Sequence, residues 1–195
     1  MKALITFSAA TLMLAASVNA QTIEASVKND IASLNKQESV IKKEKKEEKK
    51  EIRTLKGTEV SYQAEQQFMQ DFGNINVTRW ERTPEYDKAV FTKDGQTMYA
   101  YYDIEAKLIG TTMDKVFADI PANAQKYIDS KYRGYSKAGV VFFDDNEFND
   151  ADMILYNQPF EDADNYFVDL QKDNKEIIVR VNMNGDVSFF KQLKY

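Results

Sequence analysis

Two stretches of the chain follow one pattern: KDGQTMYAYYDIEAKLIGTT at residues 93–112 and KDNKEIIVRVNMNGDVSF at residues 172–189. Each begins with a turn signal, continues as a strand of alternating side chains, and turns again into a second strand. The stretches align without a gap 79 residues apart, so that Asp103 aligns with Asn182. This match predicts two antiparallel hairpin units built to the same plan.

A helical pattern precedes each of these units. Apolar residues recur at every fourth position within residues 59–71, and Gly73 follows as a helix end. In the second unit we expect a helical turn over residues 113–119 and a longer helix after Pro121. The helices align 60 residues apart rather than 79. The second unit therefore contains an insertion of about nineteen residues, within residues 144–164.

These elements predict an α+β domain over residues 59–195. A helix followed by four antiparallel strands occurs twice in tandem, with copy one at residues 59–112 and copy two at residues 113–195. The copies are expected to form one curved sheet with the helices on one face. Within the insertion, the segment from Met153 to Tyr156 is expected to return to the sheet as an edge strand.

The N-terminal segment has the pattern of a signal peptide. Residues 1–20 combine Lys2, an uncharged apolar run and a small-residue cleavage site that ends at Ala20. We expect this segment to be removed, which makes the mature chain periplasmic or secreted and leaves it without a membrane span.

A charged arm follows the expected signal peptide. Residues 21–58 contain no aromatic residue and carry ten Lys and Arg against seven Asp and Glu, whereas residues 59–195 carry fifteen against twenty-four. Both shifts in composition occur near Gly57, which indicates a domain boundary there. Lys and Glu favour a helix. Polar residues interrupt its apolar stripe, so we favour a solvated linker over an oligomerising arm, and we expect no nucleic-acid partner.

The composition excludes many kinds of catalysis. The chain has no Cys and no His, which removes thiol nucleophiles, Ser-His-Asp triads and the usual zinc sites. Its seven glycines form neither a dinucleotide-binding turn nor a P-loop. We therefore expect neither an enzyme nor a cofactor. A hydrolase that uses paired carboxylates is the remaining enzymatic alternative.

The order of elements carries a family resemblance. A helix, a strand, a turn, a strand ending in Tyr102-Asp103, a turn and a strand, repeated after Ile120-Pro121, resembles the PepSY-like family of exported bacterial proteins. That family is described as similar to the β-lactamase-inhibitory protein. The resemblance covers about residues 59–193 and implies a tandem repeat in one curved antiparallel sheet, with the helices on its convex face and an inhibitor-like role.

One position departs from the family pattern. The turn after Tyr-Asp usually contains Gly, as at Gly185, whereas the first copy has Ala106. Either Ala106 adopts a positive φ, at a cost of about 1 kcal/mol, or the first turn has another shape.

Two surfaces are candidates for binding a partner. If Met98, Ala100 and Tyr102 pack beneath the helices, the alternating residues point away from them. Large aromatic and Arg side chains dominate many binding sites, so this second face is expected to be open and to dock a protein or peptide, unless the arm or a second subunit covers it. Its expected members are Tyr99, Tyr101, Arg180, Phe143, Phe167 and Phe190.

The second candidate surface is the insertion. Residues 144–164 contain eight acidic residues and no basic residue, and Asp145, Asp150 and Asp152 are its expected binding residues. Clustered oxygen ligands also suit Ca²⁺, but the EF-hand spacing fails at Asp150 and Tyr156, so calcium is the less favoured interpretation. Long loops of compact domains often carry function, and acidic residues favour a basic partner.

Together these observations predict an exported, non-catalytic, inhibitor-like binding module. It is expected to dock an unidentified protein or peptide on the open sheet face and the acidic loop. A structural or assembly protein that pairs chains through the Lys/Glu-rich arm is the main alternative, ahead of a carboxylate-dependent hydrolase.

Overall fold

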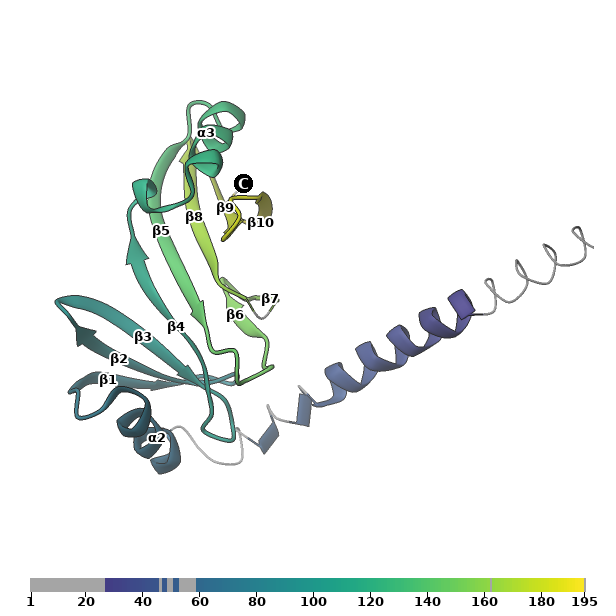
Figure 1. Cartoon of the computed structure of the whole chain (residues 1–195), viewed down its shortest axis with the longest axis vertical. Coiled ribbons are helices and arrows are strands. Elements are labelled where there is room, and N and C mark those ends of the chain that lie inside the picture. The colour runs from purple at the N-terminus through teal and green to yellow at the C-terminus, as the bar shows by residue number, and fades with distance from the viewer. Residues whose placement is uncertain (1–26, 46, 49–50, 53–58, 162, 195) are drawn as a thin grey trace, which may run out of the picture. The chain divides into compact units, whose positions relative to one another are not determined.

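The computed structural model describes residues 27–45, 47–48, 51–52, 59–161 and 163–194 (Figure 1). The expected signal peptide, residues 1–20, lies outside the described residues. The chain divides into two compact units, Met1–Glu51 and Ile52–Tyr195. In the first unit residues 27–45 are helical and exposed. The second unit contains all the strands of the described chain.

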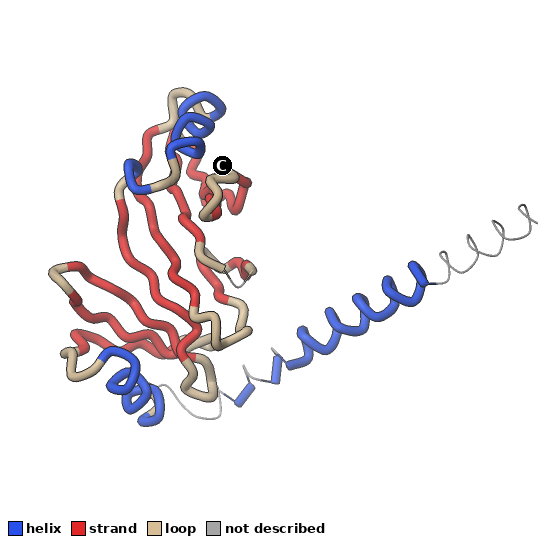
Figure 2. The backbone as a smooth tube through the Cα atoms, viewed as in Figure 1, coloured by secondary structure: helices blue, strands red, loops and turns tan. Residues whose placement is uncertain are grey.

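The second unit is an α+β domain built on one eight-stranded antiparallel sheet (Figure 2). The strand order is β1-β2-β3-β4-β5-β8-β9-β10, so each strand of this sheet pairs with the next one along the chain. β1, β2 and β3 run across the view of Figure 1, whereas β5 and β8 run up it, so the strand direction turns sharply within the sheet. The strands are β1 (Val77–Arg82), β2 (Asp87–Lys93), β3 (Gln96–Tyr102), β4 (Leu108–Lys115), β5 (Ser136–Asp145), β8 (Asn165–Lys172), β9 (Lys175–Asn182) and β10 (Val187–Lys194).

Two α-helices precede the two groups of four strands. Helix α2 (Tyr62–Phe72) begins where the Ser61 hydroxyl accepts a hydrogen bond from the Ala64 amide, and it ends at Gly73, whose φ of 76° suits glycine. Helix α3 (Ala122–Lys131) follows Pro121, as expected from the fixed φ of proline. The helical turn expected over residues 113–119 is shorter, because β4 continues to Lys115 and only η1 (Phe117–Asp119) is helical, as a 3-10 turn.

Both helices pack on the same face of the sheet. Ala100 and Tyr102 of β3 belong to the core beneath α2, with Ala64 and Phe68. Ile177, Val179 and Val181 of β9 belong to the core beneath α3. Followed across the sheet through the strand pairings, these two sets share one face. The alternation in the sequence therefore placed Ala100 and Tyr102 correctly beneath the helices.

The turns after β3 and β9 have the same hydrogen bonds. The Asp103 Oδ1 atom accepts from the Glu105 and Lys107 amides at 2.8 and 3.0 Å. The Asn182 Oδ1 atom accepts from the Asn184 and Asp186 amides at 3.0 and 2.9 Å.

Both turns place one residue in the left-handed region. Ala106 has a φ of 62° and Gly185 a φ of 84°. The first turn thus keeps the shape of the second although alanine replaces glycine. Of the two alternatives that the sequence left open, Ala106 therefore adopts the positive φ, which costs about 1 kcal/mol.

The insertion forms a small hairpin rather than an edge strand of the main sheet. β6 (Met153–Leu155) pairs with β7 (Gln158–Phe160) in a separate two-stranded sheet, so the expected edge-strand role of residues 153–156 was wrong. Tyr156 and Asn157 form its tip with φ of 52° and 57°. These angles are those of a type I′ turn, which supports tight antiparallel pairing of two short strands.

Candidate functional site

The hairpin of the insertion covers much of the sheet face opposite the helices. Met153 and Phe160 are 1% and 6% exposed and pack among aromatic side chains of the sheet. The Phe160 ring lies 5.1 Å from Phe143 and 4.8 Å from Phe167, in edge-to-face geometry. This aromatic cluster consists of Tyr101, Ile109, Phe143, Met153, Phe160, Phe167, Ile178 and Phe190.

The open sheet face expected from the sequence was therefore wrong for four of its six residues. Phe143 and Phe167 are fully buried, and Tyr101 and Phe190 are 6% exposed. The side-chain direction was correct, since all four point away from the helices. Their burial has a physical cause: apolar side chains of the hairpin remove this aromatic surface from water.

Hydrogen bonds to β10 hold the hairpin in place. The Lys191 Nζ atom donates to the carbonyl oxygens of Tyr156 and Asn157 at 2.7 and 3.3 Å. The Gln158 Nε2 atom donates to the Phe190 carbonyl oxygen at 3.1 Å. Burial of the Tyr156 side chain, together with nearby acidic groups such as Asp169, raises the pKa of Tyr156 to about 12. The hairpin is thus fixed by polar contacts as well as by packing.

Tyr101 acts as a core residue. Its hydroxyl shares a buried hydrogen bond of 2.9 Å with the Thr112 Oγ1 atom, and burial raises the pKa of Tyr101. The Tyr86 ring meets it edge to face at 4.9 Å. These contacts satisfy the tyrosine within the domain, so it has no surface left to offer a partner.

Tyr99 and Arg180 are the two expected face residues that remain partly accessible. Tyr99 is half-buried, with the Lys88 Nζ atom 5.7 Å from its ring centre. The Arg180 side chain is 27% exposed and lies 3.9 Å from the exposed Glu161 carboxylate. A partner role for these two residues stays a prediction.

The acidic loop, residues 144–152, runs from the end of β5 to the start of β6 and is anchored by two asparagines. Asn149 is 8% exposed, and its Nδ2 atom donates to the Leu108 carbonyl oxygen at 3.1 Å and to the Asp103 carboxylate at 3.4 Å. The Asn146 Nδ2 atom donates to the same Leu108 carbonyl oxygen at 2.7 Å. The Asn149 amide closes a turn onto the Asn146 carbonyl oxygen at 2.9 Å. The loop is therefore fixed against the start of β4.

Phe148 stands at the tip of this anchored turn and is 95% exposed. Such exposure is unusual for a large apolar side chain, especially beside residues that are held in place. Phe148 was not among the binding residues predicted from the sequence. The signal was present, because it is the one aromatic residue among the acids of residues 144–152.

The three acidic residues expected to bind a partner differ in setting. Asp150 and Asp152 are exposed on the loop, whereas Asp145 is half-buried and its backbone amide donates to the Asp164 carboxylate at 2.8 Å. Partial burial and the charge of Asp164 raise the pKa of the neighbouring Asp144. In the part of the chain that the structure describes, no three acidic side chains are grouped closely enough to hold a metal ion.

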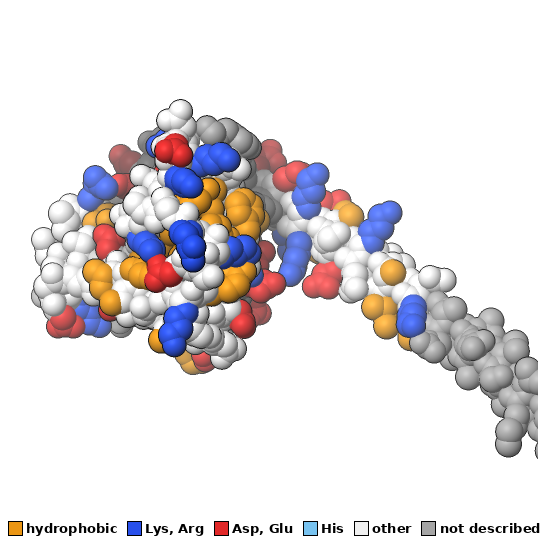
Figure 3. Space-filling view, turned by 90° about the horizontal axis from the view of Figure 1, so that it is seen from above, with side chains coloured by type: hydrophobic (Ala, Val, Ile, Leu, Met, Phe, Trp, Pro, Cys, Tyr) orange, Lys and Arg blue, Asp and Glu red, His pale blue; other side chains and the backbone are white. Residues whose placement is uncertain are grey.

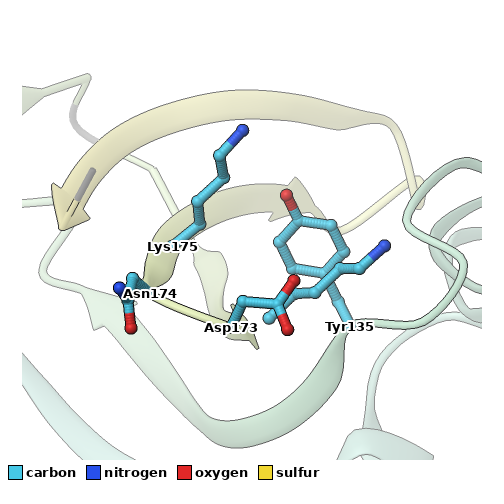
Figure 4. Close-up of a pocket in the computed structure, with 5 residues that line it drawn as sticks. Tyr135, Asp173, Asn174 and Lys175 are labelled. Carbon is cyan, nitrogen blue, oxygen red and sulfur yellow. The ribbon is translucent and has the colours of Figure 1, made fainter.

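The start of β5 and the end of β8, which lie farthest from this loop, carry a basic surface. Figure 3 looks onto this end of the domain and shows Lys and Arg side chains around hydrophobic ones, with some acidic side chains among them. A hollow of about 350 Å³ lies there, lined by Tyr135, Lys172, Asp173, Asn174 and Lys175. In Figure 4, Asn174 and Lys175 point away from the Asp173 carboxylate. The lining contains no convergent set of acid, base and nucleophile.

None of the helices among the described residues combines the length and apolar character needed to cross a membrane.

Comparison with known proteins gives structural likeness alone. No family model matches the chain, and no curated protein matches it. A BLIP-like protein from Bacteroides fragilis is similar with a TM-score of 0.55 and 15% identity, over 71% of this chain and 90% of that one. A DUF2874 family protein from Bacteroides uniformis has a TM-score of 0.56 and 10% identity, over 70% of this chain and 90% of that one. A Bacteroides eggerthii protein proposed to be periplasmic has a TM-score of 0.55 and 11% identity, over 70% of this chain and 89% of that one. The domain therefore has a BLIP-like fold.

Proposed function

We propose that this protein is an exported, non-catalytic binding module that docks a basic protein or peptide through its acidic loop, residues 144–152. The observation that carries this proposal is the 95% exposure of Phe148 on a turn whose neighbours are fixed. Transfer of a phenylalanine side chain from water into a partner's pocket contributes about 1.5–3 kcal/mol. An exposed aromatic anchor among acidic residues is therefore well suited to recognition.

The anchoring of the loop supports the same role. Asn149 and Asn146 tie the turn to the Leu108 carbonyl oxygen, so Phe148 is held outward before any partner arrives. A preorganised loop loses less conformational freedom on binding than a flexible one. The cost of ordering the loop is thus met during folding, and more of the contact energy remains for affinity.

The charges around Phe148 favour a basic partner. Residues 144–152 contain five acidic residues and no basic residue, and Asp150 and Asp152 are exposed. Charges at the rim of an interface act mainly on the association rate and on the choice of partner. Asp150 and Asp152 are therefore assigned to steering, and Phe148 to affinity.

The test is affinity capture from the cell envelope with matched baits. Wild type, Phe148→Ala and Phe189→Ala are compared, because Phe189 is also exposed, at 60%, but lies on β10. We expect a protein that wild type and Phe189→Ala retain and that Phe148→Ala binds about 30-fold more weakly, as for an interface anchor. Equal retention by all three baits would contradict the proposal.

The inhibitor-like part of the proposal rests on likeness in fold. The similar Bacteroides fragilis structure is BLIP-like, and the Bacteroides eggerthii protein is proposed to be periplasmic. We extend both features to this chain, which gives an inhibitor-like module that works in the periplasm or outside the cell. Purified partner from the capture experiment is then assayed with and without the module; an unchanged activity would limit the role to binding.

We also propose that the domain is a tandem duplication of PepSY-like type. The matching hydrogen bonds after β3 and β9, at Asp103 and Asn182, support this. If the turns are equivalent, replacement of DIEAK at residues 103–107 by NMNGD from residues 182–186 preserves the fold. A melting temperature more than about 10 °C below wild type would argue against equivalent turns.

An assembly role for the arm is the second candidate function. Val27, Ile31, Leu34 and Ile41 are about half exposed, at 49–61%, on the helix of residues 27–45. Apolar residues at this spacing suit pairing with another helix, although polar residues interrupt the stripe. Sedimentation with and without residues 21–58 tests this role. An oligomer that the deletion converts to a monomer would favour assembly, and an unchanged mass would remove it.

A further inference from the structure

The domain carries a second, oppositely charged surface at the far end of β5 and β8 from the acidic loop. We call it the basic end and define it as residues 126–137 and 172–175. The two segments are neighbours, because Ser136 pairs with Gln171 at the start of β5 and donates to its carbonyl oxygen at 3.1 Å. Its charged members are Lys126, Lys131, Arg133, Lys137, Lys172 and Lys175, against Asp129 and Asp173.

Most of these cations are free to interact with a partner. Among the described residues, Lys126, Arg133, Lys172 and Lys175 form no ion pair within the domain, and all are exposed. The other two cations have partners: Lys137 pairs with Asp129, and the Lys131 Nζ atom donates to the Tyr127 hydroxyl at 2.7 Å. The basic end thus presents unneutralised positive charge although the domain as a whole is acidic.

Tyrosine side chains lie between the cations. The Lys131 Nζ atom is 5.0 Å from the Tyr127 ring centre and 5.7 Å from that of Tyr132, and the Lys172 Nζ atom is 5.9 Å from that of Tyr135. Tyr127 is 42% exposed. Lysine and tyrosine are both amphipathic, with an apolar stem or ring and a polar tip, which suits them to a boundary between water and lipid.

We propose that the basic end binds the surface of an anionic phospholipid membrane. Charge complementarity is the first argument, since each Lys or Arg close to an anionic bilayer contributes about 1 kcal/mol of attraction. The separation of charge within the domain is the second. β5 has 10 residues and is about 30 Å long, with the basic end at its start and the acidic loop at its end.

This separation decides the balance between attraction and repulsion. At physiological ionic strength, charges interact over a screening length of about 8 Å. Six cations and two acids at the basic end lie within reach of a bilayer that touches it, whereas the acids of residues 144–152 lie several screening lengths away. An acidic domain is therefore attracted when its basic end faces the membrane, and it then presents the acidic loop away from the surface.

A small anion fits this surface less well than an extended one. The hollow at the basic end is lined by Asp173 as well as Lys172 and Lys175, so its local charge is reduced. Cations from α3, from the start of β5 and from the β8–β9 turn are spread over several elements and suit a broad surface.

Vesicle flotation tests the proposal. The exported chain is mixed with vesicles of phosphatidylcholine alone or with about 30% phosphatidylglycerol, at low ionic strength and at about 1 M salt. We expect binding to anionic vesicles alone, abolished by high salt. The double variant Lys172→Gln, Lys175→Gln should bind about 25-fold more weakly, which corresponds to about 1 kcal/mol for each lysine.

A matched variant controls for net charge and for the Lys-rich arm. Lys93→Gln, Lys107→Gln removes the same charge from exposed sites on the β2–β3 hairpin and the turn before β4 and should bind like wild type. Equal loss by both double variants, or no flotation of wild type at low salt, would overturn the proposal. So would a mass in solution that rises at low salt and falls in the Lys172/Lys175 variant without flotation, because the basic end then serves a second copy.

Discussion

Substitution of Phe143 by Ala tests whether the inserted hairpin seals the sheet. Phe143 is fully buried, and its ring meets Phe160 of the hairpin at 5.1 Å with an interplanar angle of 88°. Removal of a buried phenylalanine ring from a core costs about 3–5 kcal/mol. For a domain of this size, each 1 kcal/mol lowers the melting temperature by about 3 °C. We therefore expect Phe143→Ala to melt about 10 °C or more below wild type.

Thermal unfolding followed by circular dichroism, supported by urea titration, measures this change. Phe148→Ala is the matched control, because it removes the same side chain five positions further along the chain where the ring is 95% exposed. Its stability should stay within about 0.5 kcal/mol of wild type. A melting temperature of Phe143→Ala within about 3 °C of wild type would refute the burial of the aromatic cluster.

A double-mutant cycle separates the hairpin from the rest of the core. Phe160→Ala should also be strongly destabilising, and the pair Phe143 and Phe160 should show a coupling of about 0.5–1.5 kcal/mol, as expected for aromatic rings in contact. Strictly additive losses would mean that the two rings do not touch in solution and that the hairpin leaves the face.

Three further outcomes are expected. Tyr101→Ala should lower the melting temperature by several degrees because the ring is 6% exposed, whereas Tyr99→Ala, at a half-buried site, should cost distinctly less; equal losses would contradict the assignment. Gly110→Ala should melt at least about 5 °C lower, because its Cβ would lie 2.5 Å from a backbone carbonyl oxygen and 2.7 Å from the Phe143 ring, and an unchanged curve would show that β4 and β5 are further apart. Burial raises the pKa of Asp169, so the ionised carboxylate destabilises the folded state at pH values above that pKa. This destabilisation disappears as the pH falls and the carboxylate is protonated. Asp169→Asn should therefore stabilise the domain at neutral pH and not in acid, and urea titrations at the two pH values check this.

The sequence predicted the main sheet well because its strands are long and alternate regularly. β9 has 8 residues and lies between the two turn signals of the stretch at residues 172–189, so its place in the chain was predicted. Alternation also assigned Ala100 and Tyr102 to the helix face. These signals are local, and they do not depend on what packs above the sheet.

The cover over the opposite face is a tertiary contact, and alternation does not reveal it. β6 and β7 have 3 residues each, too few for a period to be read. Their turn is Tyr156-Asn157, without the Gly that marks a type I′ turn in sequence. Phe143, Phe167 and Phe190 therefore resembled a binding face, although they form a core with the insertion.

The left-handed conformation of Ala106 could be inferred from the sequence, whereas the exposure of Phe148 could not. The alignment with Gly185 located the left-handed residue because turn geometry depends on a few neighbouring residues. The outward position of Phe148 depends on Asn149, which is held by β4 far away in sequence. An anchor of this kind is recognised only once the fold is known.

The order of the main sheet has a kinetic consequence. Since each of its strands pairs with the next one in line, neighbouring segments zip together without waiting for distant parts of the chain. β5 and β8 are separated by nineteen residues, and the pairing of β6 with β7 within them shortens the span that must close there. Such a meander joins segments that are neighbours in the sequence, and it is expected to refold faster than a sheet whose strands pair across long connections.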